Sequence, residues 1–183
     1  MDNLQNIEAH HDIILVNIDD EPIGFGEKMD VHRRALMHRA FSVLAFNAKG
    51  ETLLQRRALE KYHSPGLWTN TCCSHPLPGE ETMEAALRRT QEEMGFTCPL
   101  TYLGKFHYLA PFDNGLTENE VDHVFTGNFY GEPNPNPAEV CETKWIDIQE
   151  LTDWMAANPE DFTVWFRIIA TKVFKQGKLV DRI

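Results

Sequence analysis

Residues 80–96 read EETMEAALRRTQEEMGF, and this stretch is the strongest indication of fold in the chain. Its apolar residues Met83, Ala86 and Leu87 recur at the spacing of one helix face. Thr82 suits the cap at the start, and Gly95 suits the position just after a helix C-terminus. The pattern predicts a helix over residues 81–94.

The segments on either side are typical of strands and of two further helices. Residues 13–18 form a β-branched run before a turn, and residues 41–48 and 52–57 read as a hairpin that turns at Lys49-Gly50. The other predicted strands are residues 102–110, 121–130 and 145–148, and the other predicted helices are residues 148–157 and 162–175. We therefore expect one α/β domain over residues 1–183, with residues 1–12 as a loose N-terminal extension.

The charge balance restricts the partners. The chain carries 17 basic and 28 acidic residues, a formal net charge of −11. Non-specific binding to nucleic acid or to an anionic membrane needs a basic surface, so we expect neither. An anionic substrate would need a local basic cluster or bound cations.

Cysteine usage and the N-terminus indicate a cellular setting. The four cysteines show no CxxC spacing and no disulfide framework, which favours a reducing compartment. Residues 1–6 lack the basic start and apolar run of a secretory signal, and no apolar stretch is long enough to span a bilayer. We expect a cytoplasmic protein.

A set of histidines and glutamates is suited to binding a metal. Glu118 and Glu120 are two residues apart, so on a strand both side chains would point to one face, and His75 follows a cysteine pair. His32 and His38 are six residues apart, which requires a turn between them if both reach one site. Imidazoles and carboxylates together suit a divalent ion such as Zn²⁺, Mn²⁺ or Mg²⁺. Spacing alone leaves two alternatives open: Asp122 shares the strand face, and each histidine by itself is more commonly structural.

Cys72 and Cys73 should point to opposite sides of an extended segment. One thiol could then enter a pocket while the other packs in the core, where free cysteines usually lie. The residues alone do not choose between them.

Basic residues near these motifs could receive phosphate groups, because guanidinium and ammonium groups bind phosphate oxygens. These residues are Lys28, Arg56, Arg57 and Lys61. A charged strand end is an equally good interpretation. Trp165 lies in an apolar helix and reads as core, unless the chemistry makes a carbocation that its ring could stabilise.

The helical stretch resembles part of the Nudix box, a loop–helix–loop that holds Mg²⁺ on a diphosphate. Glu80, Arg88 and the pair Glu92-Glu93 match the box. Ser74 stands where the box has glycine, and Arg89 stands where it has glutamate. The lost carboxylate weakens the metal cluster that hydrolysis needs, so the fold can survive without the hydrolytic chemistry.

Motifs over most of the chain resemble type I isopentenyl-diphosphate isomerase. They are Asn47-Ala48-Lys49-Gly50, residues 68–76 (WTNTCCSHP), Glu118-Asn119-Glu120 and Trp165-Phe166. The resemblance implies a single-domain Nudix-like sandwich, with a central mixed sheet flanked by helices. It also implies a reversible allylic rearrangement of isopentenyl diphosphate to dimethylallyl diphosphate, in isoprenoid biosynthesis.

The resemblance implies roles for individual residues. Cys73 would be the catalytic thiol, Tyr108 would sit beside Glu120, and Trp165 would stabilise a carbocation. One tightly bound divalent ion (Mn²⁺, Zn²⁺ or Mg²⁺) would be held by His32, His38, His75, Glu118 and Glu120. Glu93 would hold a Mg²⁺ on the substrate diphosphate, which would contact Lys28, Arg57 and Lys61. The division of acid and base between Cys73 and the Glu120–Tyr108 pair stays open.

Two other functions compete with the isomerase. A Nudix-type diphosphohydrolase fits the partial box, and a non-catalytic metal-binding module fits the histidines and glutamates. We expect a monomer that acts on a small-molecule diphosphate.

Overall fold

The computed structural model describes residues 11–183. Its elements follow the order β1 (Asp12–Val16), β2 (Pro22–Glu27), α1 (Lys28–Arg33), β3 (His38–Phe46), β4 (Thr52–Arg57), β5 (Trp68–Thr69), β6 (Cys72–Ser74), α2 (Thr82–Met94), β7 (Leu100–Pro111), β8 (Thr117–Asn128), β9 (Val140–Ile146), α3 (Ile148–Ala157), a 3₁₀ turn (Pro159–Asp161), α4 (Val164–Val173), β10 (Phe174–Lys175) and β11 (Lys178–Leu179). Within these residues no helix is long and apolar enough to cross a membrane.

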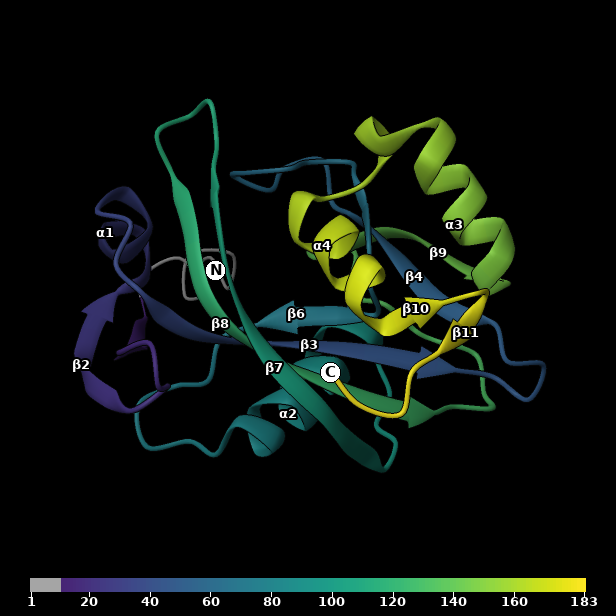
Figure 1. Ribbon diagram of the computed structural model, residues 1–183, viewed down its shortest axis with the longest axis horizontal. Helices are drawn as coiled ribbons and strands as arrows, with labels where there is room; N and C mark the ends of the chain where they lie inside the picture. Colours follow the sequence, from purple (N-terminus) through teal and green to yellow (C-terminus); the bar gives the residue numbers. More distant parts are fainter. Residues whose placement is uncertain (1–10) are drawn as a thin grey trace.

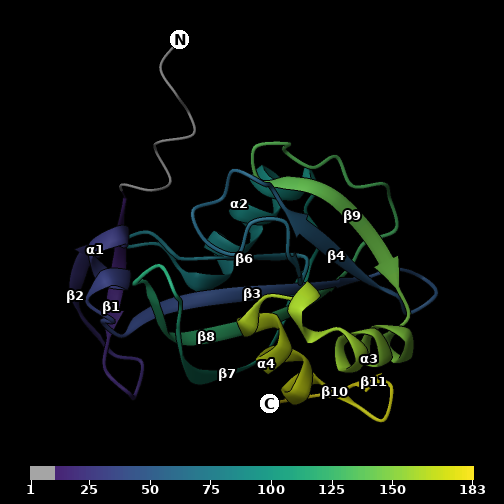
Figure 2. The ribbon, with the colours of Figure 1, turned by 90° about the horizontal axis from the view of Figure 1, so that it is seen from above.

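The mixed sheet is built around β3. This strand runs parallel to β8 along its whole length, from His38 opposite Glu120 to Phe46 opposite Asn128. β6 pairs with β3 antiparallel, β7 with β8, and β4 with β9 and β5. Helix α2 covers one face, and α3 and α4 lie over the other (Figures 1 and 2). This arrangement confirms the predicted α/β fold with a mixed sheet between helices.

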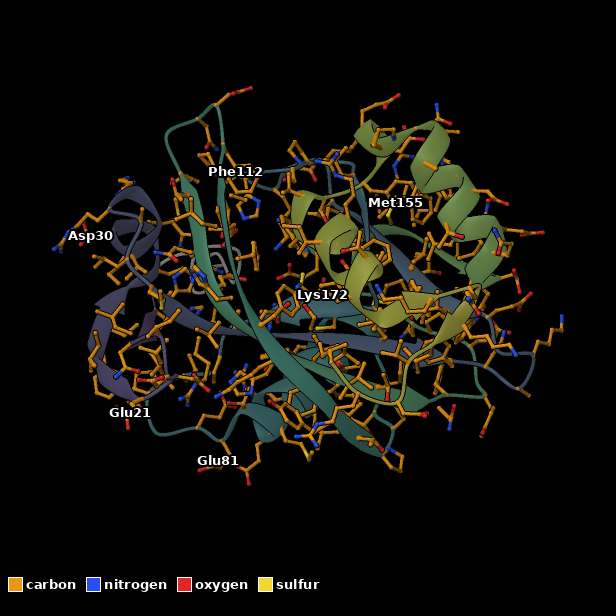
Figure 3. All side chains as sticks on the ribbon, in the orientation of Figure 1. Glu21, Asp30, Glu81, Phe112, Met155 and Lys172 are labelled. Atoms are coloured by element: carbon orange, nitrogen blue, oxygen red, sulfur yellow. The ribbon has the colours of Figure 1, made fainter. Side chains whose placement is uncertain are left out.

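The alternation of side chains along β3 explains the two layers. Phe41 and Val43 pack toward α2, together with its Ala85 and Ala86. Leu44 and Phe46 point to the opposite face and join the larger core under α4. Each face of the strand is therefore buried under its own helix, and burial of both faces fixes the strand register. Charged side chains such as Glu21, Asp30 and Glu81 lie at the periphery and point outward (Figure 3).

Helix α2 spans Thr82–Met94, which confirms the predicted helix to within one residue. Its N-cap is Glu81, so the assignment of Thr82 as the cap is wrong. Gly95 has a φ of 74°, the left-handed conformation expected after the last turn. A Cβ at this position would lie 2.2 Å from the carbonyl oxygen of Asn134, so a larger residue would displace the segment that leads to β9.

The predicted hairpin is present and pairs through Phe46 and Thr52, although the long partner of β4 is β9 and that of β3 is β8. Two other strands differ from the prediction. Strand β9 begins at Val140 rather than at residue 145, because the consecutive polar residues Glu142, Thr143 and Lys144 interrupt the apolar pattern. Strand β2, a glycine-containing edge strand, was missed altogether. The expected extension of residues 1–12 falls mainly outside the described residues, and β1 already begins at Asp12.

A buried carboxylate fixes the turn between β1 and β2 on the sheet. Asp20, 8% exposed, accepts hydrogen bonds from Arg39 Nε at 2.7 Å and Lys105 Nζ at 2.8 Å, and its other contact is His123 Nε2 at 2.8 Å. Burial raises the pKa of Asp20, but the bonds from Lys105 and Arg39 outweigh it and hold the pKa below 3.8. The N-terminal hairpin, which leads into α1, is thereby tied to β3, β7 and β8.

We expect Asp20→Asn to lower the free energy of unfolding by about 1–3 kcal/mol, because Arg39 and Lys105 lose their counter-charge. Asparagine tolerates the positive φ of 67° at this position, so the change isolates the charge. The folded pKa lies below the unfolded one, so the contribution of Asp20 is present above pH 3.8 and is lost as the pH falls through the folded pKa. Urea unfolding at neutral and acid pH measures this difference. Asp19→Asn, in the same turn but exposed, is the control. Equal losses of unfolding free energy in the two variants would contradict the role of Asp20 in holding the hairpin on the sheet.

Candidate functional site

Five buried side chains meet at one end of the β3–β8 pair. His32 comes from α1, His38 from the start of β3, and His75 from the segment after β6. Glu118 and Glu120 are two residues apart on β8. One donor atom from each of these five residues lies within 4.8 Å of every other. Helix α1 ends at Arg33 and Ala35 has a φ of 51°, so the turn required between His32 and His38 is present.

Backbone contacts aim the imidazoles into this cluster. His32 Nδ1 lies 2.6 Å from the carbonyl oxygen of Lys28, and His38 Nδ1 lies 2.8 Å from that of Leu36. With the proton assigned to Nδ1, each Nε2 is left as a lone-pair donor facing the carboxylates. Metal-binding histidines are commonly held in this way. The cluster therefore suits a divalent metal ion, with the five donors as its ligands.

Glu120 is the centre of the hydrogen-bond network. His75 Nε2 lies 2.9 Å and His38 Nε2 3.2 Å from its Oε1, and the Tyr108 hydroxyl donates to Oε2 at 2.6 Å. Burial raises the pKa of Glu120, but the bonds from His38 and Tyr108, among others, outweigh it and lower this pKa to about 2. Burial and the charge of Glu120 raise the pKa of Tyr108 well above 10. At neutral pH the site thus pairs an ionised carboxylate with a protonated phenol.

The histidines differ in their electrostatics. Burial lowers the pKa of His32, but its contact with Glu118 at 3.2 Å outweighs this and raises the pKa above 6.5. Burial and the neighbouring His38 hold the pKa of His75 well below 6.5. A neutral imidazole is the form that binds a metal.

The two cysteines point to opposite faces, as their alternation predicted. Cys73, opposite Ser42 of β3, is half-buried and lines the pocket beside the cluster. Cys72 is fully buried and packs with Phe41 and α2. Burial raises the pKa of the Cys73 thiol to about 12, so this group carries its proton at neutral pH. The geometry therefore selects Cys73 as the thiol available to a ligand.

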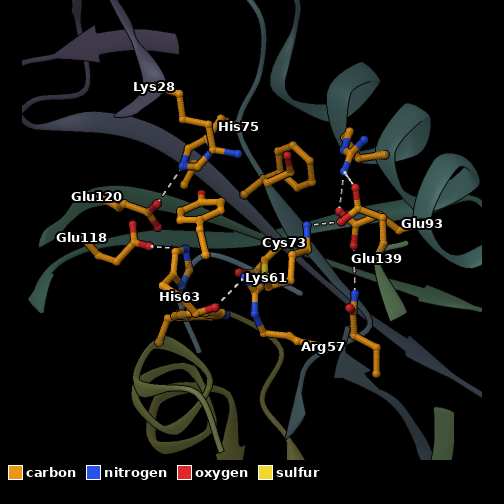
Figure 4. Close-up of a pocket in the computed structure, with 18 of the residues that line it drawn as sticks. Lys28, Arg57, Lys61, His63, Cys73, His75, Glu93, Glu118, Glu120 and Glu139 are labelled. Atoms are coloured by element: carbon orange, nitrogen blue, oxygen red, sulfur yellow. Dashed lines mark hydrogen bonds and ion pairs between the residues drawn. The ribbon is translucent and has the colours of Figure 1, made fainter. Parts of the chain in front are cut away.

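Cations line both ends of the same pocket, and Cys73 lies between the two ends. Lys28 lies beside His75 at the end of the five-residue cluster, whereas Lys61 and Arg89 pair with Glu139 at the other end (Figure 4). The cations are Lys28, Arg57, Lys61 and Arg89. Arg56 instead points away and pairs with Glu142 at 3.2 Å. The Trp165 ring also lines the pocket, with the guanidinium of Arg57 5.3 Å from its centroid. A pocket with cations, an aromatic ring, a thiol and a carboxylate–phenol pair can hold an anion and move protons.

Sequence reasoning missed three residues of this pocket. Arg89, which was interpreted as a lost carboxylate, lies in it and contacts Glu93 at 2.8 Å. Glu139 reaches the pocket from the segment before β9, and nothing in its local sequence indicates this. His63, which no sequence motif singles out, is buried and lines the pocket with its ring 5.5 Å from that of Trp165.

Asp122, the alternative on the same strand face, lies outside the five-residue cluster. It accepts a hydrogen bond from the Ser42 hydroxyl at 2.9 Å. Burial and the charge of Glu120 raise its pKa well above 3.8. Its nearest partner is therefore a hydroxyl, and the five-residue set is complete without it.

Comparison with known proteins shows which family this chain resembles. Residues 36–166 match the NUDIX domain. The isopentenyl-diphosphate Delta-isomerase of Serratia proteamaculans is 51% identical over 157 residues, which cover 86% of this chain and 88% of the relative. The isopentenyl-diphosphate Delta-isomerase of Burkholderia multivorans is 51% identical over 154 residues, which cover 84% of this chain and 88% of the relative. The crystal structure of DR0079 from Deinococcus radiodurans shares the fold at a TM-score of 0.76 and 20% identity, covering 90% of this chain and 100% of that one.

The match over residues 36–166 defines the class of protein, a NUDIX-domain fold. Within that class, the chain belongs to the family of isopentenyl-diphosphate Delta-isomerases.

We expect His75→Ala to weaken binding of Mn²⁺ or Zn²⁺ by more than the roughly 10–100-fold that loss of an outer contact typically costs, because it removes one of five donors. Isothermal titration calorimetry of the metal-free protein with Mn²⁺ or Zn²⁺ measures the affinity. His107→Ala is the control, since His107 is exposed on β7 and outside the cluster. Unchanged affinity in His75→Ala would exclude this residue as a ligand.

Proposed function

We propose that this protein interconverts isopentenyl diphosphate and dimethylallyl diphosphate, the reaction named by its relatives. One observation carries the proposal beyond the names: Cys73 and the Glu120–Tyr108 pair line the same pocket and come from different strands. An allylic rearrangement needs one group that gives a proton and another that takes one.

The proton count of this reaction balances without an external reagent. A proton adds to the terminal methylene of the alkene and leaves a tertiary carbocation, and a second proton leaves the neighbouring carbon on the diphosphate side. In the free pocket the protons lie on Cys73 and Tyr108 and the negative charge lies on Glu120. A donor and an acceptor are thus in place before substrate arrives. Because the reaction is reversible, donor and acceptor exchange roles with its direction.

Trp165 is the residue that we assign to the carbocation. Its ring is 3% exposed, so water has little access to that wall of the pocket. An aromatic face attracts a cation more strongly when both are desolvated. Excluding water also protects the carbocation from capture.

We assign the diphosphate to the cations that line the pocket, and Lys28, Arg57 and Lys61 would bind its oxygens. Glu93 would hold the Mg²⁺ that accompanies it, which supplies charge neutralisation. The tightly bound ion, Mn²⁺, Zn²⁺ or Mg²⁺, would be held by His32, His38, His75, Glu118 and Glu120 and would fix the orientation of Glu120. The free thiols favour a reducing, cytoplasmic setting. We also propose that the protein is a single-domain monomer.

A Nudix-type diphosphohydrolase has less support. Arg89 replaces a carboxylate of the box and pairs with Glu92 at 2.6 Å and with Glu93 at 2.8 Å. It therefore adds positive charge where hydrolysis by this fold needs another metal ligand.

Proton NMR of the purified protein with isopentenyl diphosphate and Mg²⁺ tests the function. We expect the methyl signals of dimethylallyl diphosphate to appear until equilibrium is reached. Release of inorganic phosphate or pyrophosphate would support the hydrolase instead. Metal binding without any turnover would support a binding module.

We expect Cys73→Ala to abolish turnover, because no other thiol lines the described part of the pocket. Cys72→Ala, one residue away on the opposite face, is the matched control and should cost little activity. Circular dichroism checks that both variants fold. Equal losses in the two variants would remove Cys73 from its role.

Replacing Glu120 by glutamine should lower kcat by roughly 10²–10⁴-fold, the range typical of a lost acid–base group. The amide keeps the shape but not the charge that accepts the Tyr108 proton. The same NMR assay measures the rate, with metal content determined in parallel. A near-normal rate with bound metal would contradict the assignment.

A further inference from the structure

Glu139 is a carboxylate placed among the cations of the pocket, and the proposed mechanism gives it no task. Its side chain is 12% exposed and forms ion pairs with Lys61 and Arg89, the latter at 3.4 Å. Figure 4 shows Glu139 and Glu93 together at this end, away from Glu118 and Glu120. Lys61, one of the cations assigned to the diphosphate, and the neighbouring Arg89 are therefore already in contact with a carboxylate of the protein.

The backbone holds Glu139 in this position from two sides. Its carbonyl oxygen accepts from the amide of Ala58, at the end of β4, at 2.9 Å. Its own amide donates to the carbonyl oxygen of Asn136 at 2.9 Å. The amide of Asn136 in turn donates to the carbonyl oxygen of Glu93, near the end of α2, at 2.8 Å. Glu139 is thus fixed between the strand that carries Arg57 and the helix that carries Arg89.

This arrangement has a consequence for anion binding. A phosphate oxygen that approaches Lys61 and Arg89 competes with the Glu139 carboxylate for the same N–H groups. It also meets a negative charge in a poorly solvated place, where repulsion between like charges is strong. A free anion must overcome both costs, whereas an anion that brings its own divalent cation offers Glu139 a new counter-charge.

We propose that Glu139 makes the pocket select the metal-bound form of a diphosphate over the metal-free form. It holds Lys61 and Arg89 in the empty pocket in place of the substrate phosphates. When the metal–diphosphate enters, the two cations pass to the phosphate oxygens and the carboxylate turns to the metal ion. This inference rests on the proposed function only in taking the ligand to be a diphosphate.

Calorimetry with inorganic pyrophosphate, with Mg²⁺ and in magnesium-free buffer, tests the proposal. Wild-type protein should bind magnesium pyrophosphate at least about tenfold more tightly than pyrophosphate alone. In Glu139→Gln this ratio should fall by about tenfold, mainly because metal-free binding becomes tighter once the competing charge is gone. Equal affinities of the wild type for the two forms would overturn the proposal, whatever the variants do.

Two further variants separate this role from a structural one. Glu139→Asp keeps the charge and should restore the preference for magnesium pyrophosphate. Glu142→Gln removes an exposed carboxylate that pairs with Arg56 at 3.2 Å and should change nothing. If Glu139 merely holds the segment before β9 in place, Glu139→Gln should weaken both forms together, and that result would overturn the proposal.

The NMR assay of isopentenyl diphosphate distinguishes the two levels of failure. Suppose that the wild type isomerises the substrate but Glu139→Gln leaves the ratio of affinities for magnesium pyrophosphate and free pyrophosphate unchanged. That result would reject the role of Glu139 and keep the proposed function. If this affinity ratio falls in Glu139→Gln but the wild type does not isomerise isopentenyl diphosphate, the selectivity stands and the isomerase function is rejected.

Discussion

The parallel pairing of β3 with β8 is the constraint on which the site depends. It sets His38 opposite Glu120, and the antiparallel pairing of β7 with β8 sets Tyr108 opposite the same glutamate. Antiparallel β6 then places Cys73 opposite Ser42, a few positions along β3. A shift of one residue in the β3–β8 register would turn the carboxylates of β8 to the other face of the sheet. Burial of both faces of β3, under α2 and under α4, opposes such a shift.

The pocket buries many charged side chains, and several of them are paired with an opposite charge inside it. At one end imidazoles and a phenol surround two carboxylates, and at the other Lys61 and Arg89 contact Glu93 or Glu139. Leaving one buried charge without a partner costs more than the pair contributes. An incoming anion therefore has to exchange partners with the protein, which ties its binding to the cations that accompany it. This exchange allows an acidic chain, with a net charge of −11, to accept a diphosphate.

Local patterns predicted the elements whose signal lies within their own sequence. Helix α2 shows helical periodicity and a terminal glycine, and Val121, Val124 and Phe125 of β8 are residue types typical of strands. The sequence missed β2 because its glycines weaken a strand pattern, and it missed the pairing of β3 with β8 because a parallel pairing leaves no local turn. The candidate ligands were found because their residue types point to metal chemistry. Arg89 and Glu139 were not, since their contact joins positions fifty residues apart, and only the tertiary fold shows that a lost carboxylate has become part of a charged pocket.

Two retained positions of the box, Glu80 and Gly95, shape the loop–helix–loop, whereas a third, Glu93, lines the pocket. Glu80 accepts two hydrogen bonds from Arg88, at 2.7 and 2.8 Å, and one from the amide of Leu77, so this pair holds the loop against the helix. Gly95 ends the helix where a side chain would collide with Asn134. The altered positions, Ser74 and Arg89, both line the pocket. A loop–helix–loop can therefore keep the contacts that shape it while the residues facing the ligand change, and similarity of fold to other NUDIX structures does not by itself fix the reaction.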